Sequence, residues 1–169
     1  TFRQFDNKNW SAAVRRDHMD RSGIDIQVLS PLPELLSYWF EPKVTAEMAK
    51  HVNGSIANMI MFDESRFQGL GMVPMQDPAL AARMLEDLKK NSGFRGVELG
   101  SNINGKSPAD PFFAEFWAAA NELDMAVFIH GIKPSGGDRL VGPEVMANIV
   151  GVPMDTALCV TSCINAGIA

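Results

Sequence analysis

The sequence predicts an α/β protein in which parallel strands alternate with helices, and three observations support this fold class. Short apolar runs are followed by longer segments with the apolar spacing of a helix. Pro, Gly and Asp mark the connections, and no short hairpin signal joins neighbouring apolar runs. Parallel strands need crossover segments between them, so this alternation favours a sheet covered by helices.

The first half of the pattern contains two strands and one long helix. A strand is predicted over residues 24–30, where Pro31 and Pro33 close the apolar run. A helix is predicted over residues 44–67, and the second strand over residues 70–73, where Pro74 stops it.

The second half repeats this alternation with clearer helix boundaries. Asp77 is a predicted N-cap and Pro78 suits the first helical position, so a helix should begin there. Its apolar residues recur at helical spacing, with lysines at its end. The predicted elements are a helix over 79–90, a strand over 96–99, a helix over 111–122 and a strand over 125–130.

Two architectures fit this order: an open doubly wound sheet and a (β/α)8 TIM barrel. The sequence has no GxGxxG or GxxxxGK[ST] motif, which argues against a nucleotide-binding open sheet. A complete barrel takes about 250 residues. The chain has 169 residues and only four visible strand–helix units. We therefore expect residues 1–169 to form a single partial barrel domain of about four units.

Composition narrows the classes of partner. With 46% hydrophobic and 21% charged residues, the chain has the make-up of one globular domain. A net charge of −5 without a basic block argues against nucleic acid. No continuous apolar run approaches the roughly 18 residues of a membrane span, so no membrane segment is expected. The start lacks the order of a secretory signal, which makes the cytoplasm the expected location, although a first residue of Thr1 suggests a fragment.

The two cysteines, Cys159 and Cys163, are four residues apart in a helical pattern. On one helix face a disulfide is geometrically awkward, and no second pair completes a zinc site. We expect buried or half-buried thiols in a reducing compartment.

Polar or ligating side chains follow each predicted strand. In both architectures the carboxyl ends of the strands carry the chemistry, so these side chains are the first candidates for a site. They are Ser30, Gln76, Asp77, Ser101, Asn102 and His130.

Four segments carry a resemblance to a known family. They are RDHMDRSGIDIQVLSP at 16–31, GLGMVPMQDPALAARMLEDL at 69–88, RGVELGSNINGKSPADPFFAEFWAAANELDMAVFIHG at 95–131 and GVPMDTALCVTSCINAG at 151–167. Together they resemble the amidohydrolase-related metal-dependent hydrolases. The nearest branch contains 2-amino-3-carboxymuconate-6-semialdehyde decarboxylase and the hydroxybenzoate decarboxylases.

The resemblance implies a (β/α)8 barrel of which this chain holds strands two to five. The terminal histidine of the fifth strand, His130, would then be a ligand of a catalytic divalent metal, usually zinc. A neutral imidazole at a rigid strand end suits that task. From the residues alone, His130 could equally satisfy backbone groups at the strand end. His18 and His51 have polar or charged neighbours and are expected on helix surfaces.

The resemblance also implies metal ligands and an acid/base histidine that residues 1–169 do not contain. The family's first-strand His-x-His or Glu-x-His ligands are expected before residue 1. An acid/base histidine and an aspartate ligand are expected after residue 169. A catalytic zinc site needs about three protein ligands, so the chain alone is not expected to be a competent enzyme.

Three residues are candidates for substrate binding. Arg3 resembles an arginine that grips a substrate carboxylate, with a solvated surface charge as the alternative. Glu98 would lie beside the metal if it faces the barrel interior, or otherwise pair with Arg95, Lys106 or a backbone donor. Asn102, in the polar loop SNINGKS, could bind a carboxylated or phenolic acid.

The expected function is that of a metal-dependent hydrolase or decarboxylase acting on a small carboxylic or phenolic acid, in a homodimer. The residues after His130 are Gly131, Ile132 and Lys133, where the decarboxylase has Pro and an aromatic residue. This difference removes a stacking surface and adds a cation. Two alternatives stay open: an inactive half barrel that associates with another chain through its edge strands, and an open α/β domain that binds a small molecule.

Overall fold

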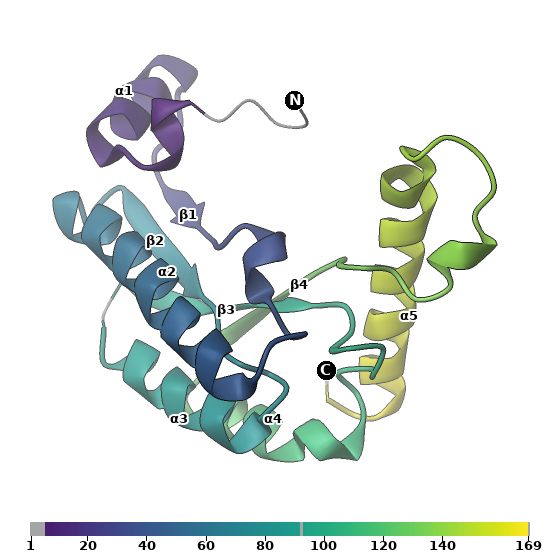
Figure 1. Cartoon of the computed structure of the whole chain (residues 1–169). Helices are drawn as coiled ribbons and strands as arrows, with labels where there is room; N and C mark the ends of the chain where they lie inside the picture. Colours follow the sequence, from purple (N-terminus) through teal and green to yellow (C-terminus); the bar gives the residue numbers. More distant parts are fainter. Residues whose placement is uncertain (1–5, 92, 169) are drawn as a thin grey trace.

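A computed structural model describes residues 6–91 and 93–168, which form a four-stranded parallel sheet (Figure 1). Neighbouring strands in the sheet follow each other in the chain, in the order β1-β2-β3-β4. The strands are β1 (Gln27–Leu29), β2 (Phe67–Gly71), β3 (Phe94–Gly100) and β4 (Ala126–His130). The α-helices are α1 (Ala12–Ser22), α2 (Pro42–Phe62), α3 (Pro78–Lys89), α4 (Ala114–Glu122) and α5 (Val152–Asn165).

The predicted boundary between the long helix and the second strand was wrong. Helix α2 ends at Phe62, and β2 covers Phe67–Gly71 rather than residues 70–73. The Ser65 hydroxyl donates to the Asp63 carboxylate at 2.6 Å in the turn between them. Met72 and Val73 are fully buried but lie after the strand, so their apolar character marks a buried connection.

Glycines inside β2 hid this strand from the sequence pattern. A side chain at Gly69 would come within 2.9 Å of Ile56, and one at Gly71 within 2.6 Å of Leu88. Because Gly69 and Gly71 have no side chains, α2 and α3 can pack closely against the sheet, and a larger residue at either position would prevent this close packing.

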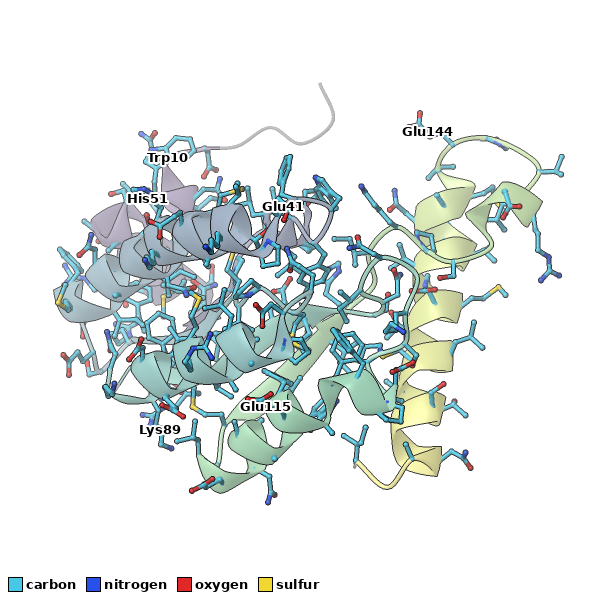
Figure 2. The ribbon with its side chains drawn as sticks, turned by 60° about the horizontal axis from the view of Figure 1, so that its bottom comes forward. Trp10, Glu41, His51, Lys89, Glu115 and Glu144 are labelled. Atoms are coloured by element: carbon cyan, nitrogen blue, oxygen red, sulfur yellow. The ribbon has the colours of Figure 1, made fainter. Side chains whose placement is uncertain are left out.

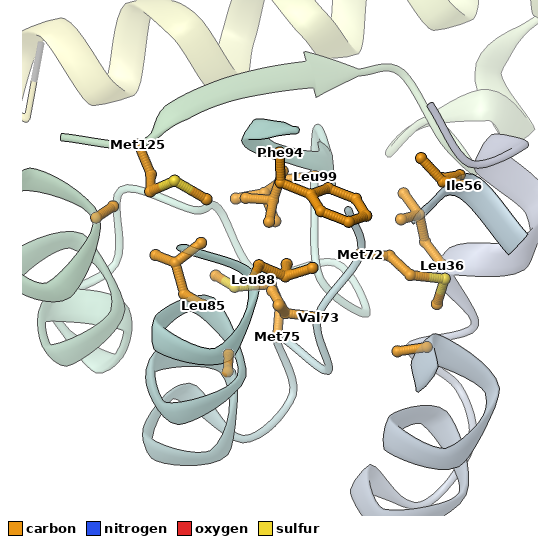
Figure 3. Packing of buried hydrophobic residues seen from close by; sticks show 14 of the residues in the cluster. Leu36, Ile56, Met72, Val73, Met75, Leu85, Leu88, Phe94, Leu99 and Met125 are labelled. Atoms are coloured by element: carbon orange, nitrogen blue, oxygen red, sulfur yellow. The ribbon is translucent and has the colours of Figure 1, made fainter. Parts of the chain in front are cut away.

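The hydrophobic core lies between one face of the sheet and α2, α3 and α4. Figure 3 shows Leu85 and Leu88 of α3 facing Leu99 of β3. Leu85, Leu99 and Phe116 of α4 are all fully buried. Burial of each such side chain contributes about 1.5–3 kcal/mol, so this layer holds the sheet and helices together.

The opposite face of the sheet is only partly covered. A short 3-10 helix, Pro33–Leu36, packs against β3 on this side. Near the two edges, Val28 of β1 is 51% exposed and Phe128 of β4 is 49% exposed. This is the face that points inward in a closed barrel.

Helix α5 stands apart from α2, α3 and α4 (Figure 1). With the short π-helix Ala147–Gly151 it forms a helical segment of 19 residues, 147–165. By length and composition alone this segment is long and apolar enough to cross a membrane, and the expectation of no membrane segment stays a prediction. The apolar residues of this helix are interrupted by polar ones, including the buried Asp155, and form no continuous run.

Candidate functional site

His130 and Glu98 lie on the partly covered face of the sheet. In the β3–β4 pairing Gly100 is the partner of His130, and Glu98 is the partner of Phe128. Side chains alternate between the two faces of a strand, and Leu99 faces the core. Glu98, Phe128 and His130 therefore share the face opposite the helices, close to the carboxyl ends of their strands.

The imidazole of His130 has an assignable tautomer. Its Nδ1 lies 2.8 Å from the carbonyl oxygen of Gly131. A carbonyl oxygen can only accept, so Nδ1 carries the proton and donates. In the neutral ring Nε2 then holds a free lone pair, which is the arrangement typical of metal-binding histidines.

Glu98 is a buried carboxyl group whose hydrogen bonding is incomplete. Its side chain is 1% exposed, and Oε1 has no hydrogen-bond partner among the described residues. Burial raises the pKa of Glu98, while hydrogen bonding to Ser30 and the charge of His130 act in the opposite direction. The expected alternative partner Lys106 instead pairs with Asp110 at 3.3 Å, and Arg95 is exposed. The pKa of Glu98 is therefore above its ordinary value, with burial as the largest cause.

Asn102 connects two loops at the carboxyl ends of the strands. Its Nδ2 donates to the carbonyl of Ile132 at 2.9 Å and to Asp155 Oδ2 at 3.0 Å. Its Oδ1 accepts from the backbone N–H of Gly105 at 2.9 Å. Asn102 is buried and has a clear structural role, and its contact with substrate stays a prediction.

A pocket of about 290 Å³ lies between the loops that follow β1, β3 and β4. The Nζ atom of Lys133 lies 3.5 Å from the ring centroid of Trp39, within the range of a cation–π contact. Asn104 donates to the carbonyl of Tyr38 at 2.7 Å across the same pocket. Sequence reasoning noted the cation of Lys133 but missed Trp39, although an aromatic residue following a strand end was an available signal.

The remaining candidate residues lie elsewhere. Arg3 falls outside the described residues. His51 is exposed and points away from α2 (Figure 2), as predicted, and His18 is half-buried on α1. The thiols of Cys159 and Cys163 are buried and free, as predicted, whereas the reducing compartment stays a prediction. Burial raises the pKa of Cys159 to about 12.

Within residues 6–91 and 93–168, no group of three or more His, Cys, Asp or Glu side chains could hold a metal ion. His130 fits a metal by its free Nε2 and its position, but it supplies one ligand where a catalytic site needs about three.

Asp155 is a polar residue of this region that sequence reasoning missed. It lies on α5, is 4% exposed, and accepts hydrogen bonds from Ser101, Asn102 and the backbone N–H of Ser135. A carboxylate inside the otherwise apolar stretch GVPMDTALCV was the signal that could have identified it.

Comparison with known proteins identifies the family and the fold of the chain. The amidohydrolase family model matches residues 1–162. The chain is 34% identical over 168 residues to a 2-amino-3-carboxymuconate-6-semialdehyde decarboxylase from Dictyostelium discoideum, covering 99% of this chain and 46% of the relative.

Two solved structures share the fold. The 5-carboxyvanillate decarboxylase from Sphingomonas paucimobilis has a TM-score of 0.81 and 29% identity, covering 89% of this chain and 45% of that one. The dihydroxybenzoic acid decarboxylase from Polaromonas sp. JS666, with bound manganese and the inhibitor 2-nitroresorcinol, has a TM-score of 0.83 and 25% identity. This match covers 92% of this chain and 49% of that one.

The chain therefore spans about half the length of these relatives. Its four parallel strands and their helices form half of a (β/α)8 barrel, as predicted. The motifs, the half barrel and the family match agree, and the chain belongs to the amidohydrolase family.

Proposed function

We propose that this chain is part of a metal-dependent decarboxylase that acts on a small carboxylated aromatic acid. The observation that carries the proposal is that His130 and Glu98 lie on the same face of the sheet, near the carboxyl ends of β4 and β3. His130 offers an imidazole nitrogen with a free lone pair, and Glu98 offers a carboxyl oxygen that has no partner in the described part of the chain. The names of the relatives, all decarboxylases of carboxylated compounds, support this reaction.

His130 would hold the metal through Nε2. The other ligands would come from residues outside 1–169: a His-x-His or Glu-x-His pair before residue 1 and an aspartate after residue 169. A bound divalent metal would act as a Lewis acid toward an oxygen of the substrate. Zinc is the metal expected from the family resemblance, whereas the Polaromonas structure contains manganese.

Decarboxylation breaks the bond between a substrate carbon and its carboxylate carbon, releases CO₂ and needs a proton on the carbon that remains. An acid/base histidine after residue 169 would supply that proton. Glu98 in its neutral form would donate a hydrogen bond to a substrate oxygen, because a protonated carboxyl group is a donor. This is the substrate-binding role that we assign to Glu98.

The pocket beside this site suits a planar anion. The ring of Trp39 offers a stacking surface and Lys133 a positive charge, and Asn102 and Asn104 offer amide groups. Aromatic stacking combined with an ammonium group recognises an aromatic carboxylate. We also assign Arg3 to the substrate carboxylate, and we expect a homodimer in the cytoplasm.

A second candidate function is that of an inactive half barrel that associates with another chain. The observation that favours it is the exposure of Val28 and Phe128 at the two edges of the sheet. Exposed strand edges invite pairing with other strands.

The test is a combined assay of metal content and CO₂ release, using carboxylated aromatic acids, on the protein that carries this chain. We expect about one divalent metal per chain, and its loss in His130→Ala with an unchanged circular dichroism spectrum. His51→Ala, an exposed histidine, is the matched control. Metal retained at full stoichiometry in His130→Ala would refute the ligand assignment. Metal-free, inactive protein would favour the second candidate.

A further inference from the structure

Helix α5 contacts the loops after β3 and β4 through one buried carboxylate. Asp155 Oδ2 accepts from the Ser101 hydroxyl and from Asn102 Nδ2 at 3.0 Å. Its Oδ1 accepts from the backbone N–H of Ser135 at 2.8 Å. Hydrogen-bond donors from both loops therefore converge on a side chain that is 4% exposed.

Ser101 links Asp155 to the turn that follows His130 by hydrogen bonds to both. Its backbone N–H donates to the carbonyl of His130 at 2.8 Å, and its hydroxyl oxygen accepts from the N–H of Ile132 at 3.2 Å. The hydroxyl proton goes to Asp155. Residues on both sides of Gly131 are thus held by one serine, whose hydroxyl is oriented by Asp155.

The same helix also presses directly on Gly131. A side chain at Gly131 would lie 2.4 Å from Cγ1 of Val152 and 2.9 Å from its carbonyl oxygen. The first turn of α5 therefore packs against the backbone of Gly131. The carbonyl of Gly131 is the acceptor for Nδ1 of His130. The position of α5 consequently determines where the acceptor for the imidazole lies.

We propose that Asp155 is a positioning residue for His130: through Ser101 and the turn at Gly131, it places the carbonyl that selects the imidazole tautomer with a free Nε2. The proposal rests on the proposed function for its consequence, the binding of a metal. Its structural part, the selection of the tautomer, can be tested without a metal.

An amide at position 155 should disturb this arrangement. In Asp155→Asn only one of the two terminal atoms can accept, while the surrounding groups are donors. At least one of the three contacts from Ser101, Asn102 and Ser135 must then be lost, and two are affected if the amide nitrogen takes the Oδ2 position. A buried polar group left without a partner costs about 1–3 kcal/mol, so the turn should relax rather than stay in place.

The first test is ¹⁵N nuclear magnetic resonance of the imidazole nitrogens in metal-free protein, at a pH where the rings are neutral. The signals of His130 can be assigned as those that are missing from the spectrum of His130→Ala. We expect Nδ1 to be the protonated nitrogen in the wild type and a mixture of tautomers in Asp155→Asn. Asp138→Asn, the same change at an exposed aspartate, should keep the wild-type spectrum.

The second test is equilibrium dialysis of the protein that carries this chain against Mn²⁺ and Zn²⁺. Groups that orient a metal ligand typically contribute 10–100-fold to metal affinity, so we expect Asp155→Asn to weaken binding by about that factor. Ser101→Ala removes only the hydroxyl link and should weaken binding in the same direction. If Asp155→Asn does not fold, the test relies on Ser101→Ala instead.

The outcomes separate the two proposals. A wild type that binds neither metal refutes the proposed function, and the resonance test still decides the tautomer. Folded Asp155→Asn or Ser101→Ala with wild-type tautomer and wild-type metal affinity overturns the positioning role while the proposed function stands.

Discussion

At the scale of single residues, two polar side chains near the carboxyl ends of β3 and β4 differ in their hydrogen bonding: Nδ1 of His130 has a partner and Oε1 of Glu98 has none in the described part of the chain. His130 has a defined acceptor for Nδ1 in the carbonyl of Gly131. Glu98 is buried as deeply as the core residues but leaves Oε1 without a partner among the described residues. Native proteins rarely bury such an atom without a partner, and this is the observation on which the proposed substrate-binding role of Glu98 rests.

Replacement of Glu98 by Gln should change how stability depends on pH. Burial raises the pKa of Glu98 above its ordinary value of 4.5, so the folded state binds a proton more tightly than the unfolded state. The stabilisation is complete below the unfolded pKa and is lost as the pH rises through the folded pKa. Urea unfolding measures this effect. As the pH rises through the folded pKa of Glu98, the free energy of unfolding should lose this contribution in the wild type but not in Glu98→Gln.

Glu115→Gln is the control for that experiment, because Glu115 is exposed on α4 (Figure 2). It should reproduce the wild-type pH dependence. An identical pH dependence of stability in Glu98→Gln and the wild type would show that folding does not raise the pKa of Glu98.

Lys133 should determine affinity for the carboxylate of the substrate. Charge-assisted hydrogen bonds contribute about 1.5–3 kcal/mol, so Lys133→Met should weaken binding of a carboxylated aromatic acid by about 10–100-fold. Isothermal titration calorimetry with such an acid measures this loss. Lys89→Met, an exposed lysine of α3 (Figure 2), should bind like the wild type. If Lys133→Met and Lys89→Met bind the acid with equal affinity, Lys133 does not contact the carboxylate of the substrate.

At the scale of elements, α5 differs from α2, α3 and α4 in how it packs, because its first turn lies against the backbone of Gly131. The latter three cover the sheet through an apolar layer. In contrast, α5 contacts the loops after β3 and β4 through Asp155 and the turn at Gly131 through Val152. Small changes at this contact should therefore affect the site more than the global core.

Two glycine substitutions test this description in opposite directions. Gly131→Ala should lower the free energy of unfolding by about 1–3 kcal/mol, because the new methyl group would overlap Val152. Gly54→Ala, in α2 with no atom within 4 Å of the added Cβ, should raise it by about 0.5–1 kcal/mol. Urea denaturation measures both. A stable Gly131→Ala variant would show that α5 can move away from the turn.

At the scale of the whole molecule, the half barrel leaves its inner face and both outer strands available. Val28 and Phe128 are about half exposed. In a complete barrel further strands would cover these positions. The polypeptide of residues 1–169 expressed by itself is therefore expected to self-associate.

A charge at one edge should reduce this association. Lysine on an edge strand opposes strand pairing, so Val28→Lys should shift the concentration for association upward by about tenfold or more. Analytical ultracentrifugation over a concentration series is the measurement. Val141→Lys, at a residue that is 93% exposed in the loop before α5, controls for charge alone. Association that is equally weakened in both variants would point to general solubility rather than edge pairing.

The sequence by itself determined the class of fold and the candidate ligand. Alternating strands and helices, helix caps and family motifs depend on nearby residues, and such signals survive without tertiary context. They predicted four parallel strands and a histidine at the end of the fourth, and the structure contains both. The boundaries of α2 and β2 were missed because Gly69 and Gly71 weaken a strand pattern while serving close packing between elements.

Only the tertiary structure decided which groups meet. The free Nε2 of His130 depends on a neighbouring carbonyl, and the orphan oxygen of Glu98 depends on what covers β3. The contact between Asp155 and Ser101 joins residues 54 positions apart. Such contacts arise from the parallel register and from the placement of α5. No local pattern encodes them, because their energy comes from burial and hydrogen bonding between elements that are distant in the chain.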